Sequence, residues 1–109
     1  MIADSCPRIA QDLGLSLASV RATVNLLTEG ATVPFIARYR KEATGGLDEV
    51  QIRAIEEKLA YYTELLERRK TVVDELTAQG KLTPDLARRI ESIWVKSELE
   101  DLYLPFRPK

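Results

Sequence analysis

The sequence predicts an all-α fold: a helical hairpin, similar to a helix-turn-helix, followed by one long central helix packed with short helices. Apolar residues recur at helical spacing along most of the chain, and glycines with capping residues separate the periodic segments. No segment carries a convincing β-hairpin pattern. With 109 residues, 45% apolar and 30% charged, the chain has the size and composition of about one globular domain.

The first two helices are expected to form the hairpin, over about residues 5–30. Ile9 and Leu13 lie one turn apart, and Gly14 can end the first helix in a left-handed cap. Ser16 is placed to cap the second helix. This hairpin resembles half of a DNA-reading motif, but its outward face offers only one cation, so packing is the stronger interpretation. The apolar residues of the second helix recur at spacings of three, four and three: Leu17, Val20, Val24 and Leu27.

A long helix is predicted over about residues 49–79. Asp48 and Gln51 form a capping-box pattern at its start. Leu47 and Ile52 are spaced for a hydrophobic staple across the same turn. At about 1.5 Å per residue the helix is roughly 45 Å long, so it must project or brace other parts of the molecule. Its stripe alternates spacings of three and four through Ile52, Ile55, Leu59, Tyr62, Leu66, Arg69, Val73 and Leu76, and is widened by Leu65 and Val72.

Arg69 is the one charged residue in this apolar stripe. A long cation at a core position either extends to the edge of the core or pairs with a carboxylate of a partner helix. We therefore predict an ion pair between Arg69 and a neighbouring helix.

Two short helices are predicted after the long one. Gly80 ends the long helix, and Thr83 with Pro84 begins the next, which we expect to continue to about residue 95. Ser97 and Glu100 form a second capping-box pattern and predict the start of the last helix.

The last residues are expected to leave the domain as an extended segment. Pro105 and Pro108 disfavour helix and bias the residues before them toward extended geometry. We therefore place a helical domain at residues 1–102 and a linker toward a following domain at residues 103–109. Leu104 and Phe106 are candidates for docking onto that domain.

Composition argues against an enzyme and against a metal or cofactor site. The chain has no histidine and one cysteine, Cys6, so the commonest general base, a zinc cluster and an internal disulfide framework are all missing. Sixteen basic and seventeen acidic residues leave no global excess of positive charge for nucleic acid or membranes. Residues 1–15 contain acids and no long apolar run, which excludes a signal peptide pattern. A reducing cytoplasm fits best, with no membrane partner.

One segment, residues 30–47, is not explained by an ordinary amphipathic helix. Its cations Arg38, Arg40 and Lys41 are interleaved with Tyr39, and guanidinium groups bind phosphates while rings accept nucleobase faces. These four residues are the candidate nucleic-acid-binding site. In the alternative interpretation Phe35, Ile36 and Tyr39 pack into a core or dock on a neighbouring domain, while the three cations pair with nearby carboxylates.

Two long motifs resemble the N-terminal region of the bacterial Tex family of transcription accessory proteins. The first reads EGATVPFIARYRKE at residues 29–42 and continues as TGGLD at residues 44–48. The second reads LEDLYLPFRPK at residues 99–109, preceded by QGKLT at residues 79–83. The resemblance covers nearly the whole chain.

The resemblance implies a piece of a larger cytoplasmic, RNA-binding protein that acts in transcription. It implies a helical, helix-turn-helix-like scaffold, followed in the family by an RNase H-like domain, helix-hairpin-helix modules and an OB-fold that carries much of the nucleic-acid affinity. The implied partners are RNA or DNA, other domains of the same chain and the transcription machinery. A purely structural or protein-interaction module without nucleic-acid binding of its own is the alternative.

Overall fold

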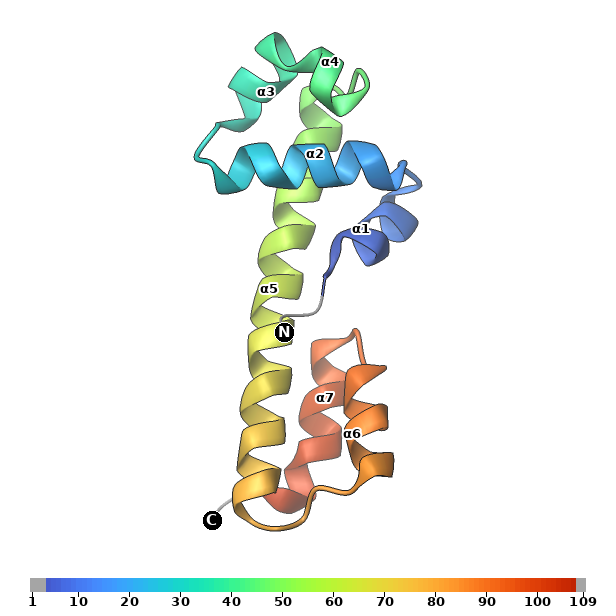
Figure 1. Cartoon of the computed structure of the whole chain (residues 1–109), viewed down its shortest axis with the longest axis vertical. Coiled ribbons are helices and arrows are strands. Elements are labelled where there is room, and N and C mark those ends of the chain that lie inside the picture. The colour runs from blue at the N-terminus through green and yellow to red at the C-terminus, as the bar shows by residue number, and fades with distance from the viewer. Residues whose placement is uncertain (1–3, 108–109) are drawn as a thin grey trace. The chain divides into compact units, whose positions relative to one another are not determined.

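The computed structural model describes residues 4–107, which form α-helices and one short 3-10 helix without any strand (Figure 1). The predicted all-α class is confirmed. The chain divides into two compact units, unit 1 (Met1–Tyr61) and unit 2 (Tyr62–Lys109), and the long helix α5 contributes to both. The elements are α1 Cys6–Leu13, α2 Leu17–Thr28, α3 Val33–Tyr39, α4 Lys41–Thr44, α5 Glu49–Ala78, α6 Pro84–Glu91, α7 Lys96–Tyr103 and the 3-10 helix η1 Leu104–Phe106.

The helical hairpin of unit 1 forms as predicted. Gly14 ends α1 in the left-handed conformation, at φ 66°. The Ser16 hydroxyl caps α2 by accepting the backbone N–H of Ser19 at 3.1 Å. The buried side of α2 differs from the predicted stripe, because Leu17 remains 40% exposed while Thr23 is fully buried. The Thr23 hydroxyl donates to the carbonyl oxygen of Ser19 at 2.8 Å, which satisfies its polar group inside the core.

The segment after the hairpin forms two short helices, α3 and α4, that the sequence did not predict. Thr32 is the N-cap of α3 and accepts the backbone N–H of Phe35 at 3.3 Å. Pro34 lies in the first turn, where its missing N–H costs no hydrogen bond. Gly45 closes α4 in the left-handed conformation. The core of unit 1 is formed by Cys6, Ile9, Ala10, Val20, Thr23, Val33, Ile36, Thr44, Leu47, Ile52 and Ile55.

The start of α5 confirms the predicted capping box. The Asp48 carboxylate accepts the backbone N–H of Gln51 at 2.8 Å, and the Gln51 side-chain oxygen accepts that of Asp48 at 3.0 Å. In the second half of the helix the most buried line is Tyr62, Leu65, Arg69, Val72 and Leu76, while Leu66 and Val73 are only half-buried. Leu65 and Val72, which were expected only to widen the stripe, therefore lie at its centre in unit 2.

The two short helices of unit 2 begin and end at positions that differ from the prediction. The helix α6 stops at Glu91 rather than near residue 95, and α7 begins at Lys96 with Val95 at its N-cap. The capping box predicted at Ser97 and Glu100 is therefore wrong. Ser97 lies inside the helix, and the Glu100 carboxylate is bound by Arg68 of α5 instead.

Arg69 is buried, as its position in the stripe predicts, but the predicted ion pair is replaced by another contact. Its Nη2 donates to the backbone carbonyl oxygen of Glu91 at 2.6 Å, and its guanidinium lies 5.0 Å from the centre of the Trp94 ring. The neighbouring Arg68 makes the cross-helix ion pair, to Glu100, with Nε to Oε1 at 2.6 Å and Nη2 to Oε2 at 3.1 Å.

The extended exit predicted from residue 103 begins later. Tyr103 ends α7 and is only 4% exposed, so it belongs to the helical core of unit 2. Residues 104–106 form η1, in which Pro105 fits because the first turn of a helix needs no N–H from it. The carbonyl oxygen of Phe106 accepts the side-chain amide of Gln79 at 3.0 Å. Extended geometry is reached at Arg107.

Candidate functional site

The helix α3 presents two different faces. Val33 and Ile36 point into the core of unit 1 and are 6% and 0% exposed. Phe35, Arg38 and Tyr39 are spaced three and four residues apart, so they share the outward face of the helix. One side of the short helix therefore packs into the core, while its other side carries two exposed rings and a cation.

Each ring on this face has a guanidinium beside it. The ring centres of Phe35 and Tyr39 lie 5.3 Å apart with planes tilted by 48°. The guanidinium of Arg38 lies 5.5 Å from the centre of the Tyr39 ring, and that of Arg40 lies 5.0 Å from the centre of the Phe35 ring. These distances are within the range of cation–π attraction. The two rings and two guanidinium groups thus form one cluster.

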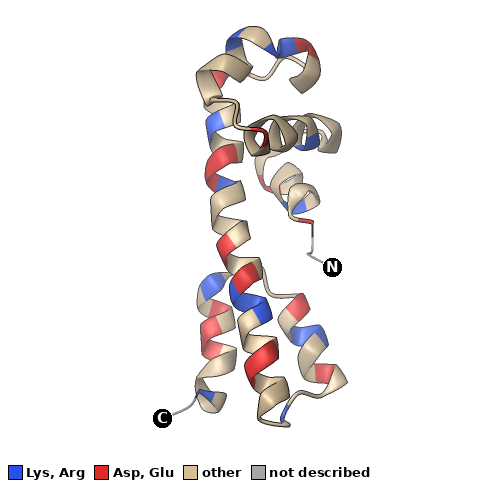
Figure 2. Cartoon of the chain, turned by 60° about the vertical axis from the view of Figure 1, so that its left-hand side comes forward, with Lys and Arg blue, Asp and Glu red and all other residues tan. Residues whose placement is uncertain are grey.

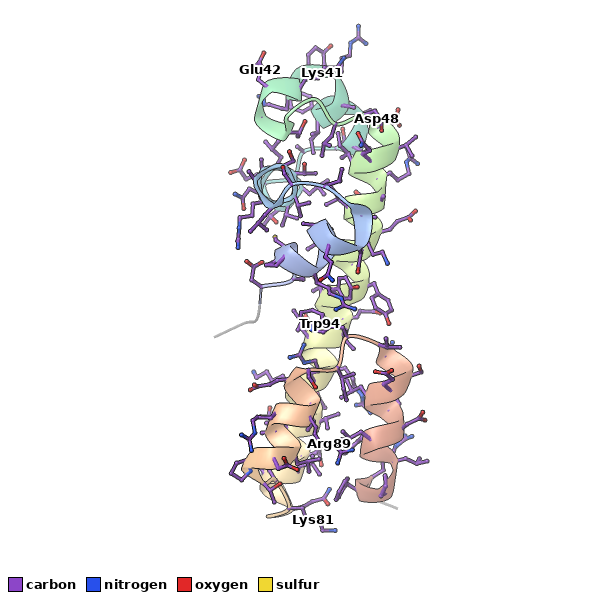
Figure 3. The ribbon with its side chains drawn as sticks, turned by 90° about the vertical axis from the view of Figure 1, so that its right-hand side faces the viewer. Lys41, Glu42, Asp48, Lys81, Arg89 and Trp94 are labelled. Carbon is purple, nitrogen blue, oxygen red and sulfur yellow. The ribbon has the colours of Figure 1, made fainter. Side chains whose placement is uncertain are left out.

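The backbone breaks at Arg40, and a third cation, Lys41, follows directly in the sequence. Arg40 has φ −129° and ψ 32°, outside the helical region, and Lys41 then begins α4. The Arg40 side chain donates to the carbonyl oxygen of Tyr39 at 3.0 Å. Figure 2 shows Lys and Arg gathered at this α3–α4 junction, and Lys41 and Glu42 mark the start of α4 in Figure 3. We call Phe35, Arg38, Tyr39, Arg40 and Lys41 the α3 patch.

The cations of the α3 patch have no carboxylate partner in the part of the chain that the structure describes. Among residues 4–107, no Asp or Glu oxygen lies within the 4 Å ion-pair limit of the side-chain nitrogens of Arg38, Arg40 or Lys41. In the same unit, by contrast, Arg21 lies 2.6 Å from Asp4. The positive charge of the patch is therefore open to an external anion.

The turn that follows α4 fixes the position of the patch. Gly45 has φ 75°, and a Cβ at this position would lie 2.9 Å from the Ser19 hydroxyl oxygen of α2. Thr44 is fully buried, and its hydroxyl accepts the backbone N–H of Leu47 at 3.3 Å. Close packing against α2 thus holds α4, and with it the cation at its first residue.

The residues predicted for docking have different outcomes. Ile36 is fully buried in the core of unit 1, so the prediction that it docks on a neighbouring domain is wrong for this residue. Phe35 is 39% exposed and belongs to the α3 patch, and Leu104 is 62% exposed. Phe106 is half-buried in unit 2. Arg38, Tyr39, Arg40 and Lys41 are all exposed, and their role as nucleic-acid contacts stays a prediction. The contact of this group with Phe35 is the feature that sequence reasoning missed.

The described part of the chain also has a concave surface in unit 2. A groove of about 480 Å³ lies between α6 and α7 of unit 2. Arg89, labelled in Figure 3, lies on its α6 side. The groove carries both signs of charge and indicates no ligand class. Its lining residues are Arg89, Ser92, Ile93, Glu98, Asp101 and Leu102.

Residues 4–107 contain neither a metal-binding cluster nor a membrane-spanning helix. No three His, Cys, Asp or Glu side chains come together there in a way that could hold a metal ion. No helix in that range is both long and apolar enough to cross a bilayer.

Comparison with known proteins identifies relatives across nearly the whole chain. The sequence profile of the Tex-like protein N-terminal domain matches residues 3–77. Protein YhgF of Escherichia coli is 54% identical over 110 residues, which cover 100% of this chain and 14% of YhgF. The transcriptional accessory protein Tex of Neisseria gonorrhoeae is 52% identical over 101 residues, covering 93% of this chain and 13% of that protein.

A more distant relative is found in Homo sapiens. The S1 RNA-binding domain-containing protein 1 is 25% identical over 84 residues, covering 77% of this chain and 8% of the human protein. This chain therefore spans about one-seventh or less of the length of each relative named here. The profile match and the two bacterial relatives agree with the resemblance found at residues 29–48 and 99–109, and the chain belongs to the Tex-like protein N-terminal domain family.

Proposed function

We propose that the chain is the N-terminal helical scaffold of a longer Tex-like transcription accessory protein, and that its α3 patch contributes nucleic-acid contacts to that protein. The open charge of the patch supports the second part, since Arg38, Arg40 and Lys41 lack carboxylate partners among residues 4–107. Clustered arginine and lysine side chains bind the phosphate groups of nucleic acids. The name of the gonococcal relative supports the assignment to transcription.

The proposed role requires no catalysis. Within this chain the scaffold supplies position and charge, and RNA or DNA is the proposed partner of the longer protein, together with its other domains and the transcription machinery. The name of the human relative, which refers to RNA binding, agrees with this partner class. Because bacterial transcription takes place in the cytoplasm, the proposal assigns the longer protein to that compartment.

The experiment that tests the proposed contact compares two triple variants of the 109-residue chain. The first is Arg38→Ala with Arg40→Ala and Lys41→Ala, which removes the charge of the α3 patch. The second, matched control replaces three exposed cations of unit 2 by alanine: Lys81, Arg88 and Arg89. Both remove three positive charges from the chain, so they separate a local site from a general effect of net charge.

Binding of fluorescent RNA and DNA oligonucleotides at low salt is the measurement, with circular dichroism to establish that each variant is folded. We expect the first triple variant to lose most of the affinity of the unaltered chain and the unit 2 variant to keep it. Equal losses in the two variants, or binding that survives in the first, would show that the α3 patch is not the contact.

A second function is favoured by one observation, the 62% exposure of Leu104. An exposed leucine on a 3-10 helix that is tied to Gln79 can dock on a neighbouring domain of the longer protein. If Leu104 docks in this way, Leu104→Asp in the longer protein disrupts the contact and increases protease cleavage around residues 104–107. Leu17→Asp, at a leucine that is 40% exposed in unit 1, is the control that leaves cleavage there unchanged.

A further inference from the structure

We infer that the α3 patch binds single-stranded rather than duplex nucleic acid, with an unstacked base lying against Tyr39. This inference rests on the proposed function, because it specifies the ligand of the same surface. Its basis is that α3 places an exposed aromatic ring beside guanidinium groups, so that the patch offers a surface for a base as well as charge for a phosphate.

The first step of the argument is the availability of a ring surface. Tyr39 is 56% exposed, and its neighbour Phe35 is 39% exposed. The tilt of 48° between the two rings leaves them unstacked on each other, so the exposed surface of Tyr39 is not used by Phe35. A nucleobase can stack on an exposed aromatic ring only when it is free of its own duplex, because bases in a duplex are already stacked and paired.

The second step is the position of the positive charge relative to that ring. Arg38 lies 5.5 Å from the centre of the Tyr39 ring and has no carboxylate partner among residues 4–107. In a single strand each base is joined to a phosphate through one sugar, so base and phosphate reach a protein surface side by side. The guanidinium of Arg38 lies over the Tyr39 ring, so a cation for the phosphate and an exposed ring for the base stand next to each other.

The third step is the small extent of the patch. Its cations occupy only residues 38–41, and the helix α3 has seven residues before it breaks at Arg40. A helix that reads a duplex lies along the major groove with further cations on both flanking backbones. The residue that follows the patch along the chain is an exposed acid, Glu42, whose negative charge disfavours a second phosphate backbone there. The patch therefore suits a few nucleotides of one strand.

The test uses three ligands with equal numbers of phosphates: a single-stranded oligonucleotide, the same strand without its bases, and a blunt duplex. RNA and DNA versions of the first ligand are compared in separate arms. The variants are Tyr39→Ala, Tyr39→Phe and the triple alanine variant of the three patch cations. Tyr61→Ala is the control, because Tyr61 is an exposed tyrosine of unit 1 outside the patch.

We expect the unaltered chain to bind the base-containing strand at least about fivefold more tightly than the abasic strand, as the stacking of one base implies. Tyr39→Ala removes this difference, whereas Tyr39→Phe and Tyr61→Ala retain it. In nuclear magnetic resonance spectra the Tyr39 ring signals move upfield with the base-containing strand only, since a stacked base shields the ring.

Three results would overturn the inference, and they differ in what they say of the proposed function. In the first, the abasic and base-containing strands bind equally and binding is lost only in the triple alanine variant. The patch is then a phosphate site without base stacking, so the inference fails and the proposed function is kept. Tighter binding of the duplex also leaves a nucleic-acid site but contradicts the choice of ligand. Absence of binding to all three ligands ends both proposals and leaves the patch as a surface for a protein.

Discussion

Arg69 and Glu91 are joined by a hydrogen bond from the Arg69 Nη2 to the Glu91 backbone carbonyl, 2.6 Å away, at the last residue of α6. The last carbonyls of a helix lack partners within the helix and carry its partial negative charge. The buried cation of α5 thus closes the end of α6 and lies against Trp94, which itself meets Tyr62 edge-on at 5.4 Å between ring centres. Burial lowers the pKa of Arg69 from its ordinary value, yet an arginine remains charged at neutral pH.

The first prediction follows from this contact. Arg69→Ala leaves a cavity and an unsatisfied carbonyl, and we expect a loss of about 2–4 kcal/mol in the free energy of unfolding of unit 2. Arg69→Met keeps most of the volume, so we expect about half that loss. Urea unfolding followed by the fluorescence of Trp94, the single tryptophan of the chain, measures both. An alanine variant as stable as the methionine variant would contradict this role of Arg69.

The ion pair between Arg68 and Glu100 gives a prediction about pH. The hydrogen bond from Arg68 holds the pKa of the Glu100 carboxyl below its ordinary value of 4.5. The pair therefore contributes stability that is present above pH 4.5 and is lost as the pH falls through the folded-state pKa. Because both side chains are about one-third exposed, we expect a contribution of only about 0.5 kcal/mol.

Glu100→Gln is the variant that tests this linkage. It cannot change charge in acid, so the difference in unfolding free energy between it and the unaltered chain should shrink as the pH is lowered from 7 to below the Glu100 pKa. Glu98→Gln, at an exposed neighbour on the same helix, is the control for general loss of negative charge. A difference that stays constant over this range would contradict the assignment.

Cys6 is expected to be an unreactive thiol. It lies at the start of α1, where a helix terminus usually favours the thiolate, but burial and then the nearby Asp4 raise its pKa from 9.0 to about 11. At pH 8 the folded chain should therefore react with iodoacetamide roughly 100-fold more slowly than the chain unfolded in urea. Asp4→Asn removes part of the shift and should accelerate the reaction. Equal rates in the folded and unfolded chain would contradict the burial of the thiol.

The raised pKa of Cys6 also makes the stability of the folded chain depend on pH. Between pH 9 and pH 11 the unfolded chain loses the thiol proton while the folded chain keeps it, so the Cys6 thiol contributes stability below pH 9 that is lost as the pH rises through about 11. In Cys6→Ala this part of the alkaline decline is absent, which urea unfolding at pH 7, 9 and 10.5 would measure. An alkaline decline of the same size in both proteins would contradict the linkage.

Gly45 gives a prediction about the support of the α3 patch. A Cβ added at Gly45 would lie 2.9 Å from the Ser19 hydroxyl oxygen, whereas a Cβ added at Gly46 would meet no heavy atom within 4 Å. Both glycines have positive φ, so alanine at either position costs about 1–2 kcal/mol of backbone strain. We expect Gly45→Ala to destabilise unit 1 further than Gly46→Ala, by about 1 kcal/mol.

Amide hydrogen exchange in α2 and α4 is the measurement for this pair of variants. Adding Ser19→Ala to Gly45→Ala removes the oxygen that the new Cβ meets, so the extra loss of protection should diminish. If the two glycine variants lose equal protection, close packing at Gly45 does not hold α4.

Much of the fold could be predicted because local signals mark where helices begin and end. The capping box of Asp48 and Gln51 and the left-handed Gly14 each depend on residues within one turn, and both form as expected. The boundaries of α6 and α7 could not be predicted in the same way. Glu100 carries a capping pattern, but Arg68, 32 residues earlier in the chain, binds its carboxylate.

The candidate site could be predicted only in part. The sequence identified its cations and Tyr39, because clustered charge is visible without a fold. It did not predict the helix α3, since seven residues with Pro34 near the start show no clear period. Without that helix, the burial of Ile36 and the outward position of Phe35 could not be separated. The assignment of the two neighbours to opposite faces required the structure.

The salt dependence of binding tests the central claim most directly, namely that Arg38, Arg40 and Lys41 contact phosphates. The affinity of the 109-residue chain for a single-stranded oligonucleotide is measured over a range of salt concentrations, and compared with that of the triple alanine variant. Each phosphate contact to a single strand contributes about −0.7 to the slope of log K against log salt, so we predict a slope that is shallower by about 2 in the variant. An unchanged slope in a folded variant would contradict the claim.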